Sequence, residues 1–190
     1  MLYLGMTLAL LVGLGGGFLI GRKYSRFALR DPLTHLPNKP AFNRSLESLV
    51  NKTAQSKEPL AILFLDIDQF KQVNDSHGHL AGDEVLRQLG ALLTSLCPSH
   101  SIFRWGGDEF TILTSGSKTS IQQSAEKIQQ AIAELTATYQ QQSILITVSI
   151  GLAQQLPDEA GSELLRRADQ ALYQAKSDGH NQICWSDSTL

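Results

Sequence analysis

Residues 102–113 read IFRWGGDEFTIL, in which two short apolar runs enclose a pair of glycines and a pair of acidic residues. The apolar runs predict two β-strands. Glycine adopts positive φ without steric cost, so Gly106 and Gly107 favour a tight turn between the strands. We therefore expect an antiparallel hairpin whose tip carries Asp108 and Glu109.

A second acidic cluster follows another apolar run. Residues 60–65, LAILFL, lead into Asp66 and Asp68, a pattern typical of a strand that is buried on both faces. Acidic residues often end strands and turns, so a structural role explains either cluster alone. If both clusters lie at one edge of a sheet, however, their carboxylates repel one another unless a hard cation lies between them. Together the clusters predict a magnesium site.

Helical and strand-like patterns alternate along the rest of residues 31–190, without an internal repeat. In the helical segments, apolar side chains recur every three or four residues, whereas the strand-like segment is short and rich in β-branched residues. We expect helices at residues 39–52, 79–96, 120–139 and 162–176, and a further strand at 144–152.

The N-terminal segment has a different character. Residues 1–21, MLYLGMTLALLVGLGGGFLIG, carry no charge, and Arg22 and Lys23 follow directly. About 20 apolar residues span a bilayer core, and positive charge after the apolar run, rather than before it, favours an uncleaved anchor. We expect a transmembrane helix at 1–21, a juxtamembrane linker at 22–30 and a folded domain at 31–190. Since cationic flanks stay in the cytoplasm, the expected location is the inner membrane, single-pass, with the domain in the cytoplasm.

The charge balance and the cysteines exclude several classes of protein. Lys and Arg number 16 against 18 Asp and Glu, for a net charge of −2. This balance gives no electrostatic reason to expect a nucleic acid as partner, and a small ligand is favoured. Cys97 and Cys184 lie far apart and outside any CxxC pair, so neither a disulfide framework nor a zinc site is expected.

The hairpin sequence RWGGDEF at residues 104–110 resembles the signature of the GGDEF-domain diguanylate cyclase family. This resemblance covers residues 31–183 and implies an α+β, palm-like nucleotidyl cyclase fold, with a central, mostly antiparallel sheet flanked by helices. Four further segments match blocks of the family in the same order: Asp31-Pro32-Leu33-Thr34 with Leu36 and Asn38; residues 66–75, DIDQFKQVND, with Gly78, His79, Gly82 and Asp83; residues 148–151, VSIG; and residues 168–179, ADQALYQAKSDG.

The resemblance implies the catalytic and metal-binding roles. The side chains of Asp66 and Asp108 and the backbone carbonyl of Ile67 would hold Mg²⁺ or Mn²⁺. Glu109 would be a metal ligand or the base that takes the proton from the attacking 3′-hydroxyl. Lys71 would stabilise charge on the phosphates in the transition state.

It also implies the residues that bind substrate. Asn74 and Asp83 would read the guanine edge, because an amide and a carboxylate together supply the donors and acceptors that guanine needs. Lys176 would contact the triphosphate. His180 stands where the family usually has arginine, and it would make a weaker phosphate contact. The remaining implied contacts come from glycines, whose lack of a Cβ lets the backbone approach a nucleotide: Gly106 and Gly107.

The implied activity is that of a diguanylate cyclase, which condenses two GTP into cyclic di-GMP and two pyrophosphates. The hydroxyl of one GTP must face the α-phosphate of the other, so a homodimer is expected. No sensory segment is recognisable, which leaves the input signal to a regulatory protein partner. Many relatives carry a product-binding Arg-x-x-Asp motif, but Cys97 and His100 occupy its positions here, so inhibition through that motif is not expected.

Two other interpretations compete with an active cyclase. One is an inactive GGDEF-like module that binds GTP or cyclic di-GMP. The presence of Asp66, Asp108 and Glu109 argues against it, as does the missing product-binding motif. The other is a scaffold whose membrane helix matters more than its soluble domain, and it would not require Asn74, Asp83 and Lys71 together. Turnover of GTP separates these alternatives.

Overall fold

The computed structural model describes residues 29–53, 59–97 and 101–186. The chain divides into two compact units, Met1–Arg30 and Asp31–Leu190, and the second contains every element described below. In chain order these elements are α2 (Lys39–Thr53), β1 (Leu60–Ile67), α3 (Phe70–His77), α4 (His79–Leu96), β2 (Ile102–Gly106), β3 (Glu109–Ser115), α5 (Lys118–Ala133), β4 (Thr136–Tyr139), β5 (Gln142–Leu145), β6 (Val148–Gln154), α6 (Gly161–Ser177) and β7 (Ile183–Trp185).

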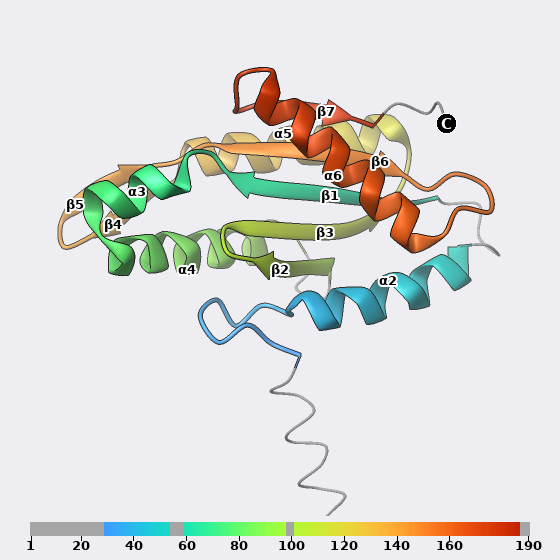
Figure 1. Ribbon diagram of the computed structural model, residues 1–190, viewed down its shortest axis with the longest axis horizontal. Helices are drawn as coiled ribbons and strands as arrows, with labels where there is room; N and C mark the ends of the chain where they lie inside the picture. The colour runs from blue at the N-terminus through green and yellow to red at the C-terminus, as the bar shows by residue number, and fades with distance from the viewer. Residues whose placement is uncertain (1–28, 54–58, 98–100, 187–190) are drawn as a thin grey trace, which may run out of the picture. The chain divides into compact units, whose positions relative to one another are not determined.

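A five-stranded sheet in the order β2-β3-β1-β6-β7 forms the centre of the second unit (Figure 1). β1 pairs antiparallel with both β3 and β6, and β2 pairs antiparallel with β3. β7 is parallel to β6, and β4 and β5 form a separate antiparallel hairpin. The predicted α+β fold, with a mostly antiparallel sheet flanked by helices, is confirmed.

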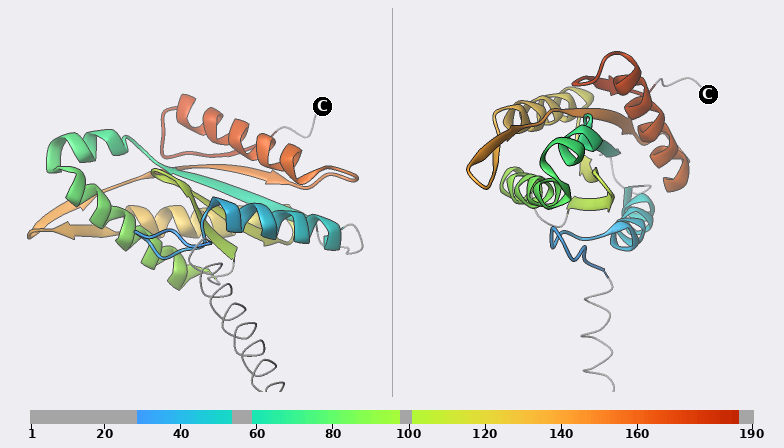
Figure 2. Two further views of the ribbon diagram at one scale, coloured as in Figure 1. Left: turned by 60° about the horizontal axis from the view of Figure 1, so that its bottom comes forward. Right: turned by 60° about the vertical axis from the view of Figure 1, so that its left-hand side comes forward.

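Helices cover both faces of this sheet: α2 and α6 lie on one, α4 and α5 on the other (Figure 2). The central strand, β1, is buried along its whole length. Leu63 and Leu65 belong to the core with α4 and α5, whereas Ile62 and Phe64 belong to the core with α2 and α6. Because side chains alternate along a strand, Asp66 continues the second series. Its carboxylate therefore emerges on the side of α6.

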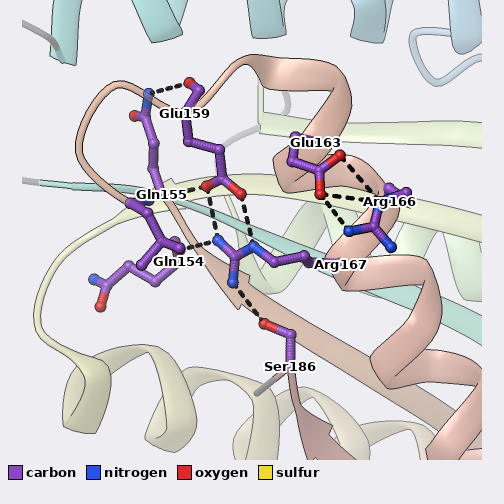
Figure 3. A network of polar contacts seen from close by, with 8 residues as sticks. Gln154, Gln155, Glu159, Glu163, Arg166, Arg167 and Ser186 are labelled. Atoms are coloured by element: carbon purple, nitrogen blue, oxygen red, sulfur yellow. Dashed lines mark hydrogen bonds and ion pairs between the residues drawn. The ribbon is translucent and has the colours of Figure 1, made fainter. Parts of the chain in front are cut away.

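The N-terminal half of α6 is fixed by a buried ion pair (Figure 3). Only 6% of the Arg167 side chain and 4% of the Glu159 side chain are exposed, and their closest atoms are 2.7 Å apart. Arg167 also donates to the carbonyl of Gln154 at 2.6 Å and to the hydroxyl of Ser186 at 2.8 Å. The guanidinium is thus bonded on several sides, which ties α6 to the end of β6 and to the segment after β7.

The helix predicted at residues 120–139 is wrong after Ala133, where α5 ends and β4 follows. In β4, the buried Ala137 lies between exposed threonines, the alternation of a strand with one face in the core. Gln140 and Gln141 adopt φ of 47° and 64° and make the turn into β5. Glutamine is not typical of the left-handed backbone conformation, so the sequence did not indicate a turn here.

Two further differences concern the strands and one helix. The strand predicted at residues 144–152 is interrupted, because β5 ends at Leu145 and β6 begins at Val148. α3 was not predicted. It is short and has no buried residue, so it lacks the apolar stripe by which a helix is recognised.

The predicted location in the inner membrane is contradicted. Within residues 29–53, 59–97 and 101–186, no helix is both long enough and apolar enough to cross a bilayer. The longest described helix, α4, has 18 residues, fewer than the roughly 20 needed, and it contains Asp83, Glu84 and Arg87. Residues 1–21, on which the prediction rested, lie outside the described residues.

Candidate active site

The two acidic clusters meet at one end of the sheet. In the antiparallel register of β1 and β3, Asp66 lies opposite Glu109. Asp108 occupies the turn between β2 and β3, and its carbonyl accepts a hydrogen bond from the backbone N–H of Ile67 at 3.4 Å. The pairing of the strands therefore brings three carboxylates to one edge, as the apolar runs around them predicted.

Lys176, near the C-terminal end of α6, extends to this edge. Its Nζ lies 2.8 Å from Oδ2 of Asp66. Burial raises the pKa of Asp66 above its ordinary value, and the negative charges of Asp108 and Asp68 raise it further, while Lys176 opposes the shift. Asp66 is thus a carboxylate whose ionised form is penalised by its surroundings and is partly compensated by one ammonium group.

The pKa of Glu109 is shifted by the same kinds of interaction. Burial raises its pKa, and the charges of Asp66, Asp108 and Asp169 add to the shift, with Lys176 acting in the opposite direction. A raised pKa brings a carboxyl closer to the range in which it can accept and release a proton near neutrality. Asp169 was not singled out from the sequence. It lies on α6 seven residues before Lys176, two helical turns away on the same face.

The oxygen atoms at this edge have the chemistry of a Mg²⁺ or Mn²⁺ site. The candidate ligands are the carboxylates of Asp66, Asp108 and Glu109 and the carbonyl of Ile67, all hard oxygen donors. The mutual repulsion that raises the pKa of Asp66 and Glu109 is the kind that a divalent cation relieves. Among the described residues, however, no three His, Cys, Asp or Glu side chains form a ready metal cluster. The ligand roles stay predictions.

The glycine turn leaves open space beside the carboxylates. A Cβ placed on Gly106 or Gly107 would meet no heavy atom within 4 Å, and Gly107 has φ of +54°. The carbonyl of Gly107 accepts hydrogen bonds from Nε and Nη2 of Arg104, at 3.1 and 2.7 Å. Arg104 therefore fixes the turn through the Gly107 carbonyl, while the space that a Cβ would occupy on either glycine is open. Sequence reasoning missed this role of Arg104, for which a basic residue inside a strand was the only signal.

The predicted guanine-reading residues lie on two adjoining helices. Asn74 is on α3 and Asp83 on α4, both half-buried, and Gly78 with φ of 84° makes the bend between the helices. A Cβ on Gly82 would lie 2.0 Å from Oδ1 of Asn74. Only glycine allows α4 to approach the Asn74 amide this closely. Lys71 lies exposed on α3.

His180 lies in a loop with an unusual backbone. Gly179, His180 and Asn181 have φ of 115°, 64° and 49°, a run of left-handed residues that is unfavourable for side chains with a Cβ. The backbone N–H of Asn181 donates to Oδ2 of Asp68 at 2.9 Å. Asp68, which the sequence grouped with Asp66, is thus bonded to the loop of His180.

The comparisons with known proteins agree with this arrangement. The sequence profile of the family described as "Diguanylate cyclase, GGDEF domain" matches residues 28–182. The chain is 39% identical over 158 residues to the diguanylate cyclase DgcP of Pseudomonas aeruginosa. The matched region covers 82% of this chain but only 24% of DgcP. The chain thus spans about a quarter of this relative's length.

Two solved structures share the fold. The GGDEF domain of DgcB from Caulobacter crescentus, solved in complex with c-di-GMP, is 30% identical and superposes with a TM-score of 0.79, covering 85% of this chain and 97% of that one. The second structure is the diguanylate cyclase SiaD of Pseudomonas aeruginosa, solved in complex with its activator SiaC. It is 26% identical with a TM-score of 0.80, and the match covers 94% of this chain and 70% of the SiaD chain. On the profile match and these likenesses, the chain belongs to the GGDEF family of diguanylate cyclase domains.

Proposed function

We propose that the chain is a diguanylate cyclase, whose catalytic domain at residues 31–190 condenses two GTP into cyclic di-GMP and two pyrophosphates. The observation that carries this proposal is the register of β1 and β3, which sets Asp66 opposite Glu109. Asp108 lies in the adjoining turn, and Lys176 is bonded to Asp66. The family membership supports the same activity.

Metal binding is the first part of the proposed mechanism. Asp66, Asp108, Glu109 and the carbonyl of Ile67 would hold Mg²⁺ or Mn²⁺, and the ion would acidify the 3′-hydroxyl and neutralise charge on the α-phosphate. Alternatively, Glu109 would be the base that accepts the proton of that hydroxyl. Lys176, which is paired with Asp66 in this structure, would contact the triphosphate.

Substrate recognition is the second part. The amide of Asn74 and the carboxylate of Asp83 would bond the guanine edge, and adenine would leave those polar groups unpaired. The open space beside Gly106 and Gly107 would let a nucleotide approach the backbone. Lys71, exposed on α3, would add positive charge near the phosphates.

Pairing of two domains is the third part. Each domain would bind one GTP, and the product is a ring of two nucleotides, so two active sites must face each other. A homodimer therefore belongs to the proposal. A regulatory protein is a further proposed partner, and the activator complex of the similar SiaD supports it.

The deciding experiment is turnover by the purified chain. With GTP and Mg²⁺ or Mn²⁺, we expect cyclic di-GMP and pyrophosphate, separated and quantified by chromatography. Glu109→Gln is nearly isosteric, and we expect it to remove turnover while the protein stays folded by circular dichroism. If the unaltered protein binds GTP or cyclic di-GMP without turnover, the inactive binding module is the correct function. Full activity of Glu109→Gln would refute the role of Glu109.

A further inference from the structure

The hydrogen bonds of Asp68 differ from those of the other carboxylates at this end of the sheet. It is 9% exposed, and its two oxygens accept three hydrogen bonds. Oδ1 accepts from the hydroxyl of Ser149 at 2.6 Å, and Oδ2 accepts from the hydroxyl of Thr147 at 2.7 Å and from the backbone N–H of Asn181 at 2.9 Å. A buried carboxylate with this many donors is well satisfied, so it has little lone-pair capacity left for a cation.

These bonds join three separate segments. Asp68 follows β1, Thr147 and Ser149 flank the start of β6, and Asn181 lies between α6 and β7. The backbone N–H of Asp68 also donates to the carbonyl of Thr147 at 2.9 Å. The carboxylate is therefore anchored rigidly to the sheet, and the bond to Asn181 extends this rigidity to the neighbouring loop.

That loop needs an external support. His180 and Asn181 both have left-handed φ, which costs free energy for residues with a Cβ and persists only where the surroundings impose it. On its N-terminal side the loop follows Lys176, which is bonded to Asp66. On its C-terminal side, the carbonyl of Gln182 accepts from the N–H of Ile150 at 2.9 Å. The bond from Asn181 to Asp68 lies between these two attachments.

We propose that Asp68 is a positioning residue, which fixes the loop 179–181 and thereby holds His180 in place to contact the triphosphate of GTP. It acts through the loop and is not itself a metal ligand. This inference rests on the proposed function, since the triphosphate is that of the proposed substrate. Hydrogen bonds to an ionised carboxylate are roughly twice as strong as neutral ones, which suits an anchor for a strained backbone.

The test uses the purified full chain and Asp68→Asn, which keeps the size of the side chain but removes its charge and one acceptor. We expect KM for GTP to rise about tenfold, because the loss of roughly one charge-assisted hydrogen bond has an effect of this size. We expect kcat to change less than threefold. Asp66→Asn serves as comparison, and there we expect kcat to be lost. A loss of kcat in Asp68→Asn equal to that in Asp66→Asn would overturn the proposal.

Two readouts do not depend on turnover, so they separate a failure of this inference from a failure of the proposed function. The first is amide hydrogen exchange: we expect the Asn181 amide to exchange at least tenfold faster in Asp68→Asn, and an unchanged rate would overturn the anchor. The second is Mn²⁺ binding in the presence of the non-reactive α,β-methylene analogue of GTP. We expect Asp68→Asn to retain it and Asp66→Asn to lose it. Loss in both variants would assign Asp68 to the metal.

Two further variants guard against a folding defect. Thr147→Val removes one donor to Oδ2 but leaves the charge of Asp68 unchanged, so a smaller rise in KM is expected, and no rise would overturn the proposal. His180→Ala tests the route of the effect. If Asp68 acts through the loop, the double variant Asp68→Asn with His180→Ala has nearly the KM of His180→Ala alone. Fully additive effects would overturn the assignment.

Discussion

Arg104 Nη1 donates a hydrogen bond to Asp31 Oδ1 at 2.8 Å, across 73 residues of chain. The same guanidinium donates from two other nitrogens to the carbonyl of Gly107. Asp31 in turn accepts from the backbone N–H and the hydroxyl of Thr34, both at 2.8 Å. Arg104 thus connects the turn at Asp31 and Thr34 to the glycine turn of the candidate active site.

Arg104→Lys is expected to reduce kcat about tenfold to a hundredfold. Lysine keeps the charge but lacks the planar fork that bonds Gly107 and Asp31 together, and a small misplacement of catalytic groups has effects of this size. Steady-state kinetics with GTP measures it. Arg87→Lys is the control, because Arg87 forms an exposed ion pair with Glu84. Equal kcat in the two variants would show that the fork is dispensable.

The Asp31 bond makes part of the stability depend on pH. Burial raises the pKa of Asp31, but the hydrogen bonds from Arg104 and Thr34 outweigh burial and hold the pKa below its ordinary value of 3.8. The stabilisation is therefore present above pH 3.8 and is lost as the pH falls through the lower pKa of the folded state. Urea unfolding at a series of pH values measures it. We expect Asp31→Asn to be less stable than the unaltered protein at pH 7, with the difference shrinking below pH 3.8. A constant difference would contradict the linkage.

Asp66→Asn is expected to separate function from stability. It should remove turnover, because a proposed metal ligand is lost, yet raise the free energy of unfolding in metal-free buffer at pH 7. The reason is that burial and the neighbouring carboxylates raise the pKa of Asp66. The folded state then binds its proton more tightly than the unfolded state, and stability falls as the pH rises between the two pKa values. Urea unfolding with EDTA measures this, and destabilisation by the variant would be the contrary result.

The sequence predicted those features of the site that depend on local pattern. The apolar run before Asp66 and the two runs around the glycine pair were sufficient to predict β1, β2 and β3. Once these strands pair, the register places Asp66 opposite Glu109. The alternation of side chains along β1 then decides which face carries the carboxylate.

The bonds that organise the site could not be predicted in this way. Asp68 is bonded to Thr147, Ser149 and Asn181, which lie 79, 81 and 113 residues further along the chain. Contacts at such separations depend on how strands and loops assemble, and no local periodicity encodes them. An acidic residue two positions after Asp66 has the same appearance in sequence whether it binds a metal or a loop.

Two neighbouring arginines on α6 provide a matched test of burial. Arg167 is paired with Glu159 in the interior, whereas the ion pair of Arg166 with Glu163 is exposed. Arg167→Met leaves the buried Glu159 without its counter-charge, and we expect a loss of about 3–5 kcal/mol in the free energy of unfolding. Arg166→Met should lose much less, because an exposed ion pair contributes little to stability. Denaturant unfolding compares the two. Adding Glu159→Leu to Arg167→Met should restore much of the loss, and no recovery would show that the unpaired charge is not its cause.

Gly82→Ala tests the position of the Asn74 amide, which we propose reads the guanine edge. The added methyl group would lie 2.0 Å from Oδ1 of Asn74 and 3.1 Å from Cζ of Phe70, so the Asn74 side chain has to move. A shift of one hydrogen-bonding group by about 1 Å can cost up to a hundredfold. We expect KM for GTP to rise more than tenfold and the preference for GTP over ATP to decrease, both measured by product formation with each nucleotide.

The control for this change lies on the same helix. Gly90 is also a buried glycine of α4, but a Cβ there would meet Thr34 Cβ at 3.3 Å and nothing of Asn74. Gly90→Ala therefore reproduces the change in helix propensity, about 1 kcal/mol, without disturbing the amide. Its KM should stay within about threefold of the unaltered value, well below the effect of a displaced hydrogen-bonding group. If Gly82→Ala and Gly90→Ala raise KM equally, the effect comes from α4 as a whole, and Asn74 does not read the base.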